Sequence, residues 1–287
     1  MNGMAKTWIS AFRGDGPDTA FDRYLSDSGL FRPLETASEI ASLGWRVLKT
    51  IFTPPFSWVR EAVVESSHIV RLVTLSVMFA SFVYVLAFGS VLFGQIIYAL
   101  GAADRVGPGI YVGLLRELGT WLTYMVLAGI AGSALAGDLG ARKIREELDA
   151  LDVLGVDKIR TLIVPRVVAI TFAGLLLSLL VVIAIELAVL ALDTLTIHQS
   201  FATQWNAVGL IMNPYDIGAA IVKHTILGFF VGIVACQKGL SAKGGGEGVG
   251  RAVAQTVLIT FFGIWLINSL FNTGYLTVFP NALGIKG

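Results

Sequence analysis

The amino-acid sequence predicts an all-α integral membrane protein, and three observations support this fold class. Only 14% of the 287 residues are charged and 55% are apolar, whereas soluble domains carry about 25% charged residues. The charges are absent from several runs that are long enough to cross a bilayer. These runs also lack the alternation of polar and apolar residues that the strands of a membrane β-barrel show. Cys236 is the only cysteine and the net charge is +1, which excludes a disulfide scaffold and disfavours a nucleic-acid-binding protein.

Five charge-poor runs predict transmembrane helices, because the hydrocarbon core of a bilayer requires about 20 apolar residues of helix. The fourth run reaches that length only by including Lys223. The predicted spans are about 72–100, 114–137, 161–192, 215–237 and 253–279. Together they define a transmembrane domain over residues 71–287.

The distribution of Lys and Arg predicts the orientation, since cytoplasmic connections carry an excess of these residues. The first 71 residues hold eight of them, the first link one, the 138–166 link six, the 193–214 link none and the 238–252 link three. This alternation predicts a multi-pass membrane protein with a cytoplasmic N-terminus and an extracytoplasmic C-terminus.

The segment before the first span divides into two parts. Residues 1–33 are polar and rich in turn-forming residues, which predicts a flexible N-terminus. In residues 34–70, the apolar residues Ile40, Leu43, Val47 and Ile51 fall on one helical face. This pattern favours an amphipathic helix in the cytoplasmic interface. The alternative is a soluble helix that packs on a partner.

Residues 141–155 predict an amphipathic helix between the second and third spans. Ile144, Leu148 and Leu151 recur at intervals of four and three residues, as on one helical face. Gly155 marks its end. Six acidic residues balance six basic residues over 138–166. An interfacial helix on lipid headgroups is normally rich in Lys and Arg, so the balance favours a protein partner. Three pairs at i,i+4 support the helix: Arg142/Glu146, Lys143/Glu147 and Arg145/Asp149.

Five segments of the chain resemble a known family. They are LLRELG (114–119), AGSALAGDLGARKIREELDALDVLGVDKI (131–159), VPRVVA (164–169), DIGAAIVK (216–223) and EGVGRAV (247–253). They are similar to signatures of the MlaE/YrbE permeases, and the D-L-G-A-R-x-I-R-E-E variant resembles the actinobacterial YrbE branch. The resemblance implies an MlaE-like permease fold and a membrane subunit of an ABC transporter.

The resemblance also implies partners. Such permeases move lipids (phospholipids, fatty acids, mycolic-type lipids or sterols) between the inner membrane and extracytoplasmic MCE proteins. A second permease subunit, identical or paralogous, shares the lipid pathway. A separate ATPase holds ATP and Mg²⁺, so this chain is expected to carry no cofactor and no catalysis. Residues 141–155 would be the coupling helix, with Ile144, Glu146, Glu147, Leu148, Asp149 and Leu151 as its ATPase-coupling residues.

Charged residues within apolar spans are candidates for the substrate pathway, since burying a charge in a bilayer is costly. Arg116 and Glu117 either snorkel to the interface or contact lipid. Lys223 either forms an ion pair with Glu117, Glu186 or Asp216, or contacts a lipid headgroup, whereas Glu186 itself is interpreted as structural or snorkelling. The large aromatic candidates for the pathway are Trp121, Tyr124 and Trp265.

Small residues predict close helix packing, within the subunit or at a dimer seam. They are Gly129, Ser133 and Gly137 in span two, and Gly228 and Gly232 in span four. Three His and one Cys make a metal site unexpected, and the glycine cluster 243–251 lacks the spacing of a phosphate-binding loop. Two alternative functions stay open: a proton-coupled secondary transporter using Lys223, His224 and Glu186, and a non-transporting membrane anchor of a multiprotein complex.

Overall fold

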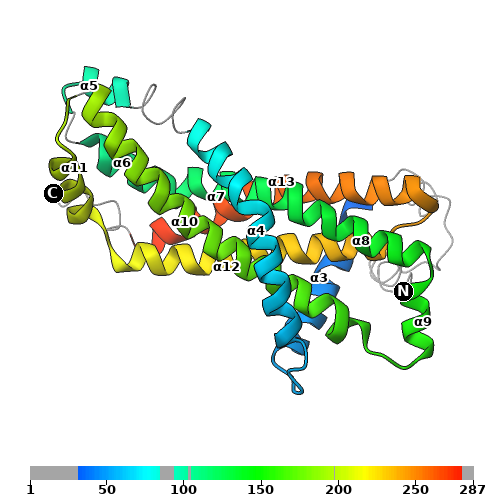
Figure 1. Ribbon diagram of the computed structural model, residues 1–287. Coiled ribbons are helices and arrows are strands. Elements are labelled where there is room, and N and C mark those ends of the chain that lie inside the picture. Colours follow the sequence, from blue (N-terminus) through cyan, green and yellow to red (C-terminus); the bar gives the residue numbers. More distant parts are fainter. Residues whose placement is uncertain (1–31, 85–93, 103–104, 197, 280–287) are drawn as a thin grey trace, which may run out of the picture.

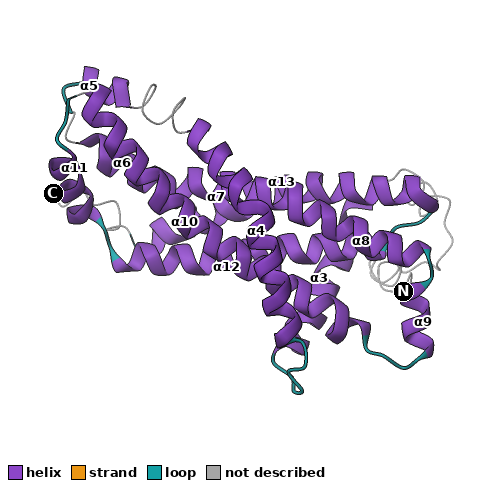
Figure 2. Ribbon diagram, in the orientation of Figure 1, coloured by secondary structure: helices purple, strands orange, loops and turns teal. Residues whose placement is uncertain are grey.

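The computed structural model describes residues 32–84, 94–102, 105–196 and 198–279, so most of the predicted flexible N-terminus lies outside the described residues. The described parts are helices joined by short loops, with no strand among them (Figure 2). The shorter helices are α3 (Arg32–Ile51), α5 (Gln95–Ala99), α9 (Glu147–Val153) and α11 (Phe201–Ile211). The predicted all-α fold is confirmed.

Five helices are long and apolar enough to cross a membrane, which confirms a multi-pass membrane protein. The first is α4 (Val59–Tyr84). The second runs continuously over Val106–Ile144, through α6 (Val106–Gly113), η3 (Leu114–Leu118), α7 (Gly119–Leu127), η4 (Ala128–Gly132) and α8 (Ser133–Ile144). The third joins η5 (Ile159–Ile163) to α10 (Val164–Thr196). The last two are α12 (Pro214–Leu240) and α13 (Gly245–Val278).

All five helices begin before the predicted spans, and the middle three also end after them. The first was predicted to start at residue 72, but α4 starts at Val59 and includes the exposed residues Arg60, Glu61 and Arg71. Part of the remainder of that span, residues 85–93, lies outside the described residues. A charge-free run marks the apolar stretch, whereas a helix continues into the polar zone because its backbone hydrogen bonds do not depend on apolar side chains.

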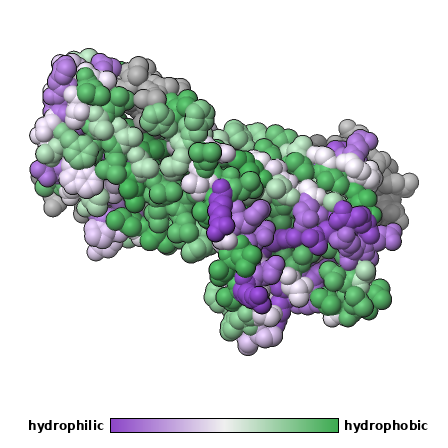
Figure 3. Space-filling view, viewed as in Figure 1, coloured by the Kyte–Doolittle hydropathy of each residue, from purple (hydrophilic) through white to green (hydrophobic). Residues whose placement is uncertain are grey.

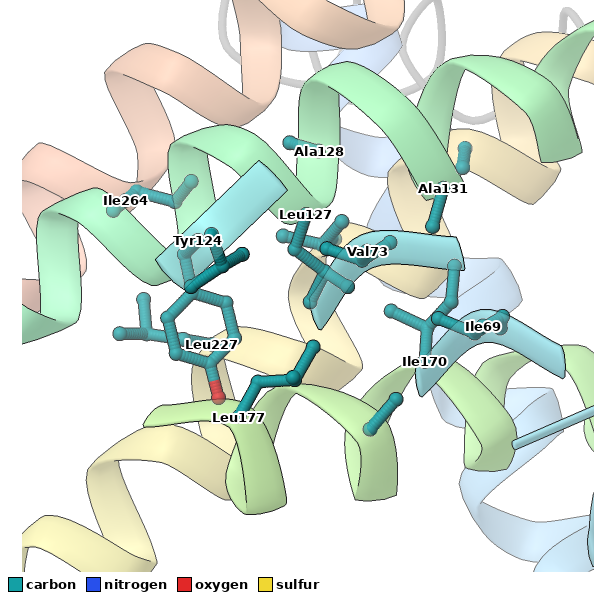
Figure 4. Packing of buried hydrophobic residues seen from close by; sticks show 14 of the residues in the cluster. Ile69, Val73, Tyr124, Leu127, Ala128, Ala131, Ile170, Leu177, Leu227 and Ile264 are labelled. Atoms are coloured by element: carbon teal, nitrogen blue, oxygen red, sulfur yellow. The ribbon is translucent and has the colours of Figure 1, made fainter. Parts of the chain in front are cut away.

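The core lies along α10, which packs against α4, α7 and α12 (Figure 1). Figure 4 shows Ile69 and Val73 of α4 facing Leu127 and Ile170, with Tyr124, Leu177 and Leu227 beside them. Helices α10 and α12 approach closely at two glycines. A Cβ added at Gly228 would lie 2.7 Å from the Thr171 Cα, and one added at Gly232 would lie 3.1 Å from the Val167 Cα. These contacts place both predicted packing glycines inside the subunit.

Helix α3 packs against α12. Leu43 and Val47 are buried, and Ile40 and Ile51 are half-buried. The predicted apolar face therefore turns toward the bundle. Trp45 (69% exposed) and Phe52 (76% exposed) point away from it, so these two side chains, and not the predicted face, are available to a membrane surface.

The two ends of the molecule differ in polarity. Helices α5, α6 and α11 lie at one end, and α9 and the turn between α12 and α13 lie at the other (Figure 1). In the face shown in Figure 3, hydrophobic residues cover the half that contains α6 and α10, and hydrophilic residues gather near α8 and the lower part of α3. This asymmetry separates two regions that carry charged residues, one within the apolar helices and one at the polar end.

Candidate functional site

A cluster of polar side chains joins η3, α12 and α13 in the half of the bundle near α6 and α11. Arg116 Nη2 lies 2.9 Å from Asp216 Oδ1, and these side chains are only 13% and 5% exposed. The Tyr275 hydroxyl donates to the same Asp216 oxygen at 2.7 Å. Asp216 thus holds the guanidinium of one helix and the phenol of another, which fixes η3 and α13 relative to the start of α12.

Glu117 is held by two amides of α13. Asn268 Nδ2 donates to one carboxylate oxygen and Asn272 Nδ2 to the other, each at 2.5 Å. The hydrogen bonds occupy both oxygens of an acidic side chain within an apolar helix, where an unpartnered charge would be costly. Glu117 is therefore part of the protein interior, whereas snorkelling would carry it to water.

Lys223 does not form the ion pair that the sequence suggested with Glu117, Glu186 or Asp216. Its Nζ donates to the backbone carbonyl of Arg116 at 2.5 Å and to Asn272 Oδ1 at 3.3 Å, and the residue is 2% exposed. Asn272 Nδ2 also donates to the Arg116 carbonyl, at 2.9 Å. This carbonyl lies in the π-helical segment η3, where the widened turn disturbs the ordinary helical hydrogen bonds.

We call these seven residues the membrane cluster: Arg116, Glu117, Asp216, Lys223, Asn268, Asn272 and Tyr275. The cluster contains two basic and two acidic side chains, so its formal charges balance. A recess of about 10 Å³ opens between Arg116, Asp216, Lys223 and Phe271, at the lower limit for one water molecule. Guanidinium and ammonium groups are suited to phosphate and carboxylate ligands, but a ligand of that size requires α12 or α13 to move.

The predicted helix over 141–155 is instead two helices. Helix α8 ends at Ile144, and α9 begins at Glu147. Between them Glu146 has φ = 62°, in the left-handed region that a continuous helix cannot contain. Gly155 does mark the end, with φ = 70° beyond the last residue of α9. We call residues 141–155 the elbow.

The break changes the predicted ion pairs of the elbow. None of the three i,i+4 pairs is present. Lys143 bonds Asp149 at 2.8 Å and Arg145 bonds Glu147 at 2.8 Å, while Arg142 lies 3.1 Å from Asp138 and 3.7 Å from Glu147. The hydrogen bond from Lys143 lowers the pKa of Asp149, and the hydrogen bond to Glu147 raises the pKa of Arg145.

The apolar residues of the elbow divide differently from the prediction. Leu148, expected to contact an ATPase, is 1% exposed and belongs to the chain's own core. Leu151 is half-buried and Ile144 is 36% exposed. The most exposed apolar side chains of the elbow are Val153 at 88% and Leu154 at 74%. Glu146 and Asp149 are exposed, as an intermolecular role requires, and Glu147 is partly so.

The family model for Permease MlaE matches residues 65–273, a range that contains both the membrane cluster and the elbow. This chain belongs to the MlaE permease family. A probable ABC transporter permease of Synechocystis is 34% identical over 173 residues, which are 58% of this chain and 64% of that protein. Protein TRIGALACTOSYLDIACYLGLYCEROL 1 of the Arabidopsis thaliana chloroplast is 32% identical over 168 residues, 58% of this chain and 48% of that protein.

A further relative is a probable ABC transporter permease of Rickettsia bellii, 28% identical over 177 residues that cover 59% of this chain and 67% of that protein. The chain thus spans from about half to about two thirds of the length of these three relatives. They come from a cyanobacterium, a plant and a proteobacterial genus, so the comparisons do not bear out the resemblance to the actinobacterial branch.

The aromatic candidates of this MlaE-family permease occupy two environments. Tyr124 is fully buried and donates its hydroxyl to the His224 carbonyl at 2.5 Å, so it joins α7 to α12 and does not line an open pathway. Trp121 packs against Trp265 across α7 and α13, and Trp265 is 39% exposed. This tryptophan pair reaches the surface of the bundle.

The small residues of span two also differ from one another. A Cβ added at Gly137 would lie 3.7 Å from Val253, whereas one at Gly129 would meet no atom within 4 Å. The Ser133 hydroxyl donates to the Gly129 carbonyl at 2.5 Å. Gly137 therefore packs within the subunit, and Gly129 faces outward.

Sequence reasoning missed the three residues that α13 contributes to the membrane cluster. Asn268, Asn272 and Tyr275 are uncharged, and a search for charges in apolar runs passes over them. Their spacing of four and three residues places them on one helical face, and that polar stripe in an apolar span was the available signal. Among the described residues, no group of three or more His, Cys, Asp or Glu side chains is placed to hold a metal ion.

Proposed function

We propose that this chain is the permease subunit of an ABC transporter that moves lipids between a bacterial inner membrane and extracytoplasmic MCE proteins. The observation that carries the proposal is the family match over residues 65–273. Relatives named as ABC transporter permeases support a separate ATPase that holds ATP and Mg²⁺. The plant relative carries the name of a galactose-bearing diacylglycerol, which supports a lipid as the cargo.

The ATPase would bind at the elbow, on the cytoplasmic side. Val153 and Leu154 form an exposed apolar tip, and the charged residues Glu146 and Asp149 lie nearby in the chain. Apolar side chains that enter a groove supply affinity, and surrounding charges fix the orientation. In this arrangement Leu148 anchors α9 to the permease itself, so that a force on the tip is transmitted to α8.

The same helix would carry that force to the lipid site. Arg116 and Ile144 lie in one continuous helix, Val106–Ile144, and 28 residues of helix span about 42 Å. Displacement of the elbow then shifts η3 against α12 and α13. Because the recess is too small for a headgroup, this movement would open it and expose Arg116 and Lys223 to a lipid phosphate or carboxylate.

The second permease subunit would contact the outward face of span two around Gly129. A glycine with no atom near its absent Cβ leaves room for a close approach by another helix. Trp265, at the surface of α13, would lie beside the lipid that enters the pathway.

The test is copurification followed by reconstitution. The transporter is purified through this chain, and the ATPase is measured in the wild type, in the double variant Val153→Glu/Leu154→Glu, and in Leu210→Glu. Leu210 is 87% exposed on α11 at the opposite end, so it controls for a new surface charge. We expect the ATPase to be lost only from the double variant, and retention there would contradict docking at the elbow.

The intact complex is then placed in proteoliposomes containing a labelled phospholipid. Lipid movement that requires ATP supports the proposal. Movement driven by a proton gradient without any ATPase would favour the secondary transporter instead. An absence of movement in an ATP-hydrolysing complex, tested with each lipid class in turn, would favour the non-transporting anchor.

A further inference from the structure

A second group of buried polar side chains lies apart from the membrane cluster, between α6, α10 and α11. Glu186 of α10 is 4% exposed, and neither of its carboxyl oxygens has a hydrogen-bond partner. Gln204 of α11 is fully buried, and both its amide nitrogen and its amide oxygen lack partners. Buried polar groups are nearly always hydrogen-bonded, so two such groups on adjoining helices require an explanation.

The backbone brings these two side chains toward each other. Glu186, Leu190 and Asp193 follow at intervals of four and three residues, on one face of α10. A Cβ added at Gly107 of α6 would lie 2.9 Å from Leu190 and 3.0 Å from Gln204 Oε1. Gln204 therefore lies over Leu190, about one helical turn, or about 5.4 Å along the axis, from Glu186.

Among the described residues, Glu186 forms no ion pair with a basic side chain. Helix α12, which packs against α10, carries two buried basic residues that are bonded elsewhere. Lys223 donates to the Arg116 carbonyl and to Asn272, and His224 bonds Thr120 and Ser178. Helix α10 itself contributes Asp193, which is fully buried and close enough to repel a negative charge on Glu186. Helix α6 contributes the phenol of Tyr111, and α11 contains no charged residue. From α4, Met78 and Phe82 line a recess with Ile185, which adjoins Glu186 in the chain. Arg116 and Asp216 lie on the far side of Tyr111, and they are already bonded to each other.

A carboxylate in this position would be a buried negative charge without a counter-ion, at large cost within an apolar segment. A neutral carboxylic acid removes that cost and adds a donor. If the two side chains turn toward each other, its O–H can donate to Gln204 Oε1, while the Gln204 amide donates to the other carboxyl oxygen. One bound proton thus satisfies the hydrogen-bonding groups that both side chains leave open.

We propose that Glu186 is a proton-binding site within the membrane, and that its neutral form pairs with Gln204 to hold α11 against α10. Loss of the proton to bulk water leaves a carboxylate that must be hydrated, so α11 separates from α10 to admit water. The proposal goes beyond lipid transport by an ABC complex, because it concerns this chain alone and requires neither the ATPase nor ATP.

The first experiment needs no variant. The full chain in nanodiscs is treated with dicyclohexylcarbodiimide, an apolar reagent that modifies protonated carboxyl groups, and each modified residue is identified by peptide mass spectrometry. We expect an adduct on Glu186 that falls several-fold from mildly acidic to alkaline pH. A water-soluble carbodiimide should modify the exposed Glu61 and spare Glu186. Absence of the Glu186 adduct, or a yield independent of pH, would overturn the proposal.

The second experiment measures the docking of α11 by amide hydrogen exchange. In the wild type, exchange in residues 201–211 should increase with pH by several-fold more than in Glu186→Gln measured at the same pH. The glutamine variant cannot lose a proton, so its α11 stays docked. Glu61→Gln, which removes an exposed carboxyl from α4, should behave as the wild type. Equal pH dependence in Glu186→Gln and the wild type would also overturn the proposal.

Discussion

The membrane cluster and the elbow both depend on opposite charges, but they use them in different surroundings. Arg116 and Asp216 are 13% and 5% exposed, whereas the four side chains in the Lys143–Asp149 and Arg145–Glu147 pairs are 33% to 59% exposed. In water each exposed pair contributes between about 0 and 1 kcal/mol. Removing one member of a buried pair costs about 3–5 kcal/mol, because the other charge is left uncompensated. The burial of the ion pairs, and not their number, therefore decides in which region the removal of a charged side chain is destabilising.

The largest expected effect tests this difference directly. Asp216→Ala leaves the Arg116 guanidinium without its carboxylate and Tyr275 without its acceptor. We expect the free energy of unfolding to fall by about 3–5 kcal/mol, measured by equilibrium unfolding in mixed detergent micelles. The matched control is Asp152→Ala at the elbow, which removes a 2.6 Å ion pair with Lys158 from an exposed position and should cost less than about 1 kcal/mol. Equal losses of unfolding free energy in the two variants would contradict the difference between the buried and the exposed ion pairs.

The second prediction concerns packing within the elbow. Leu148→Ala removes the buried anchor of α9, and we expect the local opening of this helix to become easier by about 2 kcal/mol, at the lower end for buried leucines because α9 is short. Hydrogen exchange of the α9 amides measures that opening. Val153→Ala changes the exposed last residue of α9 and should leave exchange almost unchanged. Faster exchange in the Val153 variant than in the Leu148 variant would contradict the assignment of Leu148 as the buried anchor of α9 and Val153 as an exposed residue.

The smallest expected effect is electrostatic and lies at the elbow. Lys143 lowers the pKa of Asp149, so the pair favours the folded state above the ordinary Asp pKa of about 3.9. That contribution disappears as the pH falls through the lower folded value. Lys143→Met should raise the pKa of Asp149 toward its ordinary value, as carboxyl carbon NMR would show. Added salt should reduce the difference between the two proteins, and an unchanged pKa would contradict the pairing.

The fold was predictable from the sequence because apolar length is a direct signal for crossing a bilayer. Five charge-poor runs became five long helices. The ends were not predictable, since residues such as Arg60 and Glu61 continue a helix beyond the apolar zone. The break at Glu146 was also hidden, because a left-handed conformation at a residue other than glycine depends on tertiary contacts that no local pattern reveals.

The candidate site was predictable in part, for a related physical reason. Arg116, Glu117 and Lys223 attract notice because a charge in an apolar run is rare. Their actual partners depend on how three helices are rotated. Lys223 is bonded to a backbone carbonyl in a π-turn and to the amide of Asn272. Neither partner gives a sequence signal comparable to that of a carboxylate.

The left-handed backbone of Glu146 has a consequence for the charges on either side of it. Right-handed helical dihedral angles at this residue and at its neighbour Arg145 would align α8 with α9. The i,i+4 partners Arg142/Glu146, Lys143/Glu147 and Arg145/Asp149 would then come into register. This segment thus has two pairing schemes: a bent one, in which Glu146 forms no ion pair, and a straight one, in which Glu146 would pair with Arg142. The two schemes differ in the backbone conformation of Arg145 and Glu146, and the straight scheme would withdraw Leu148 from the position it now fills.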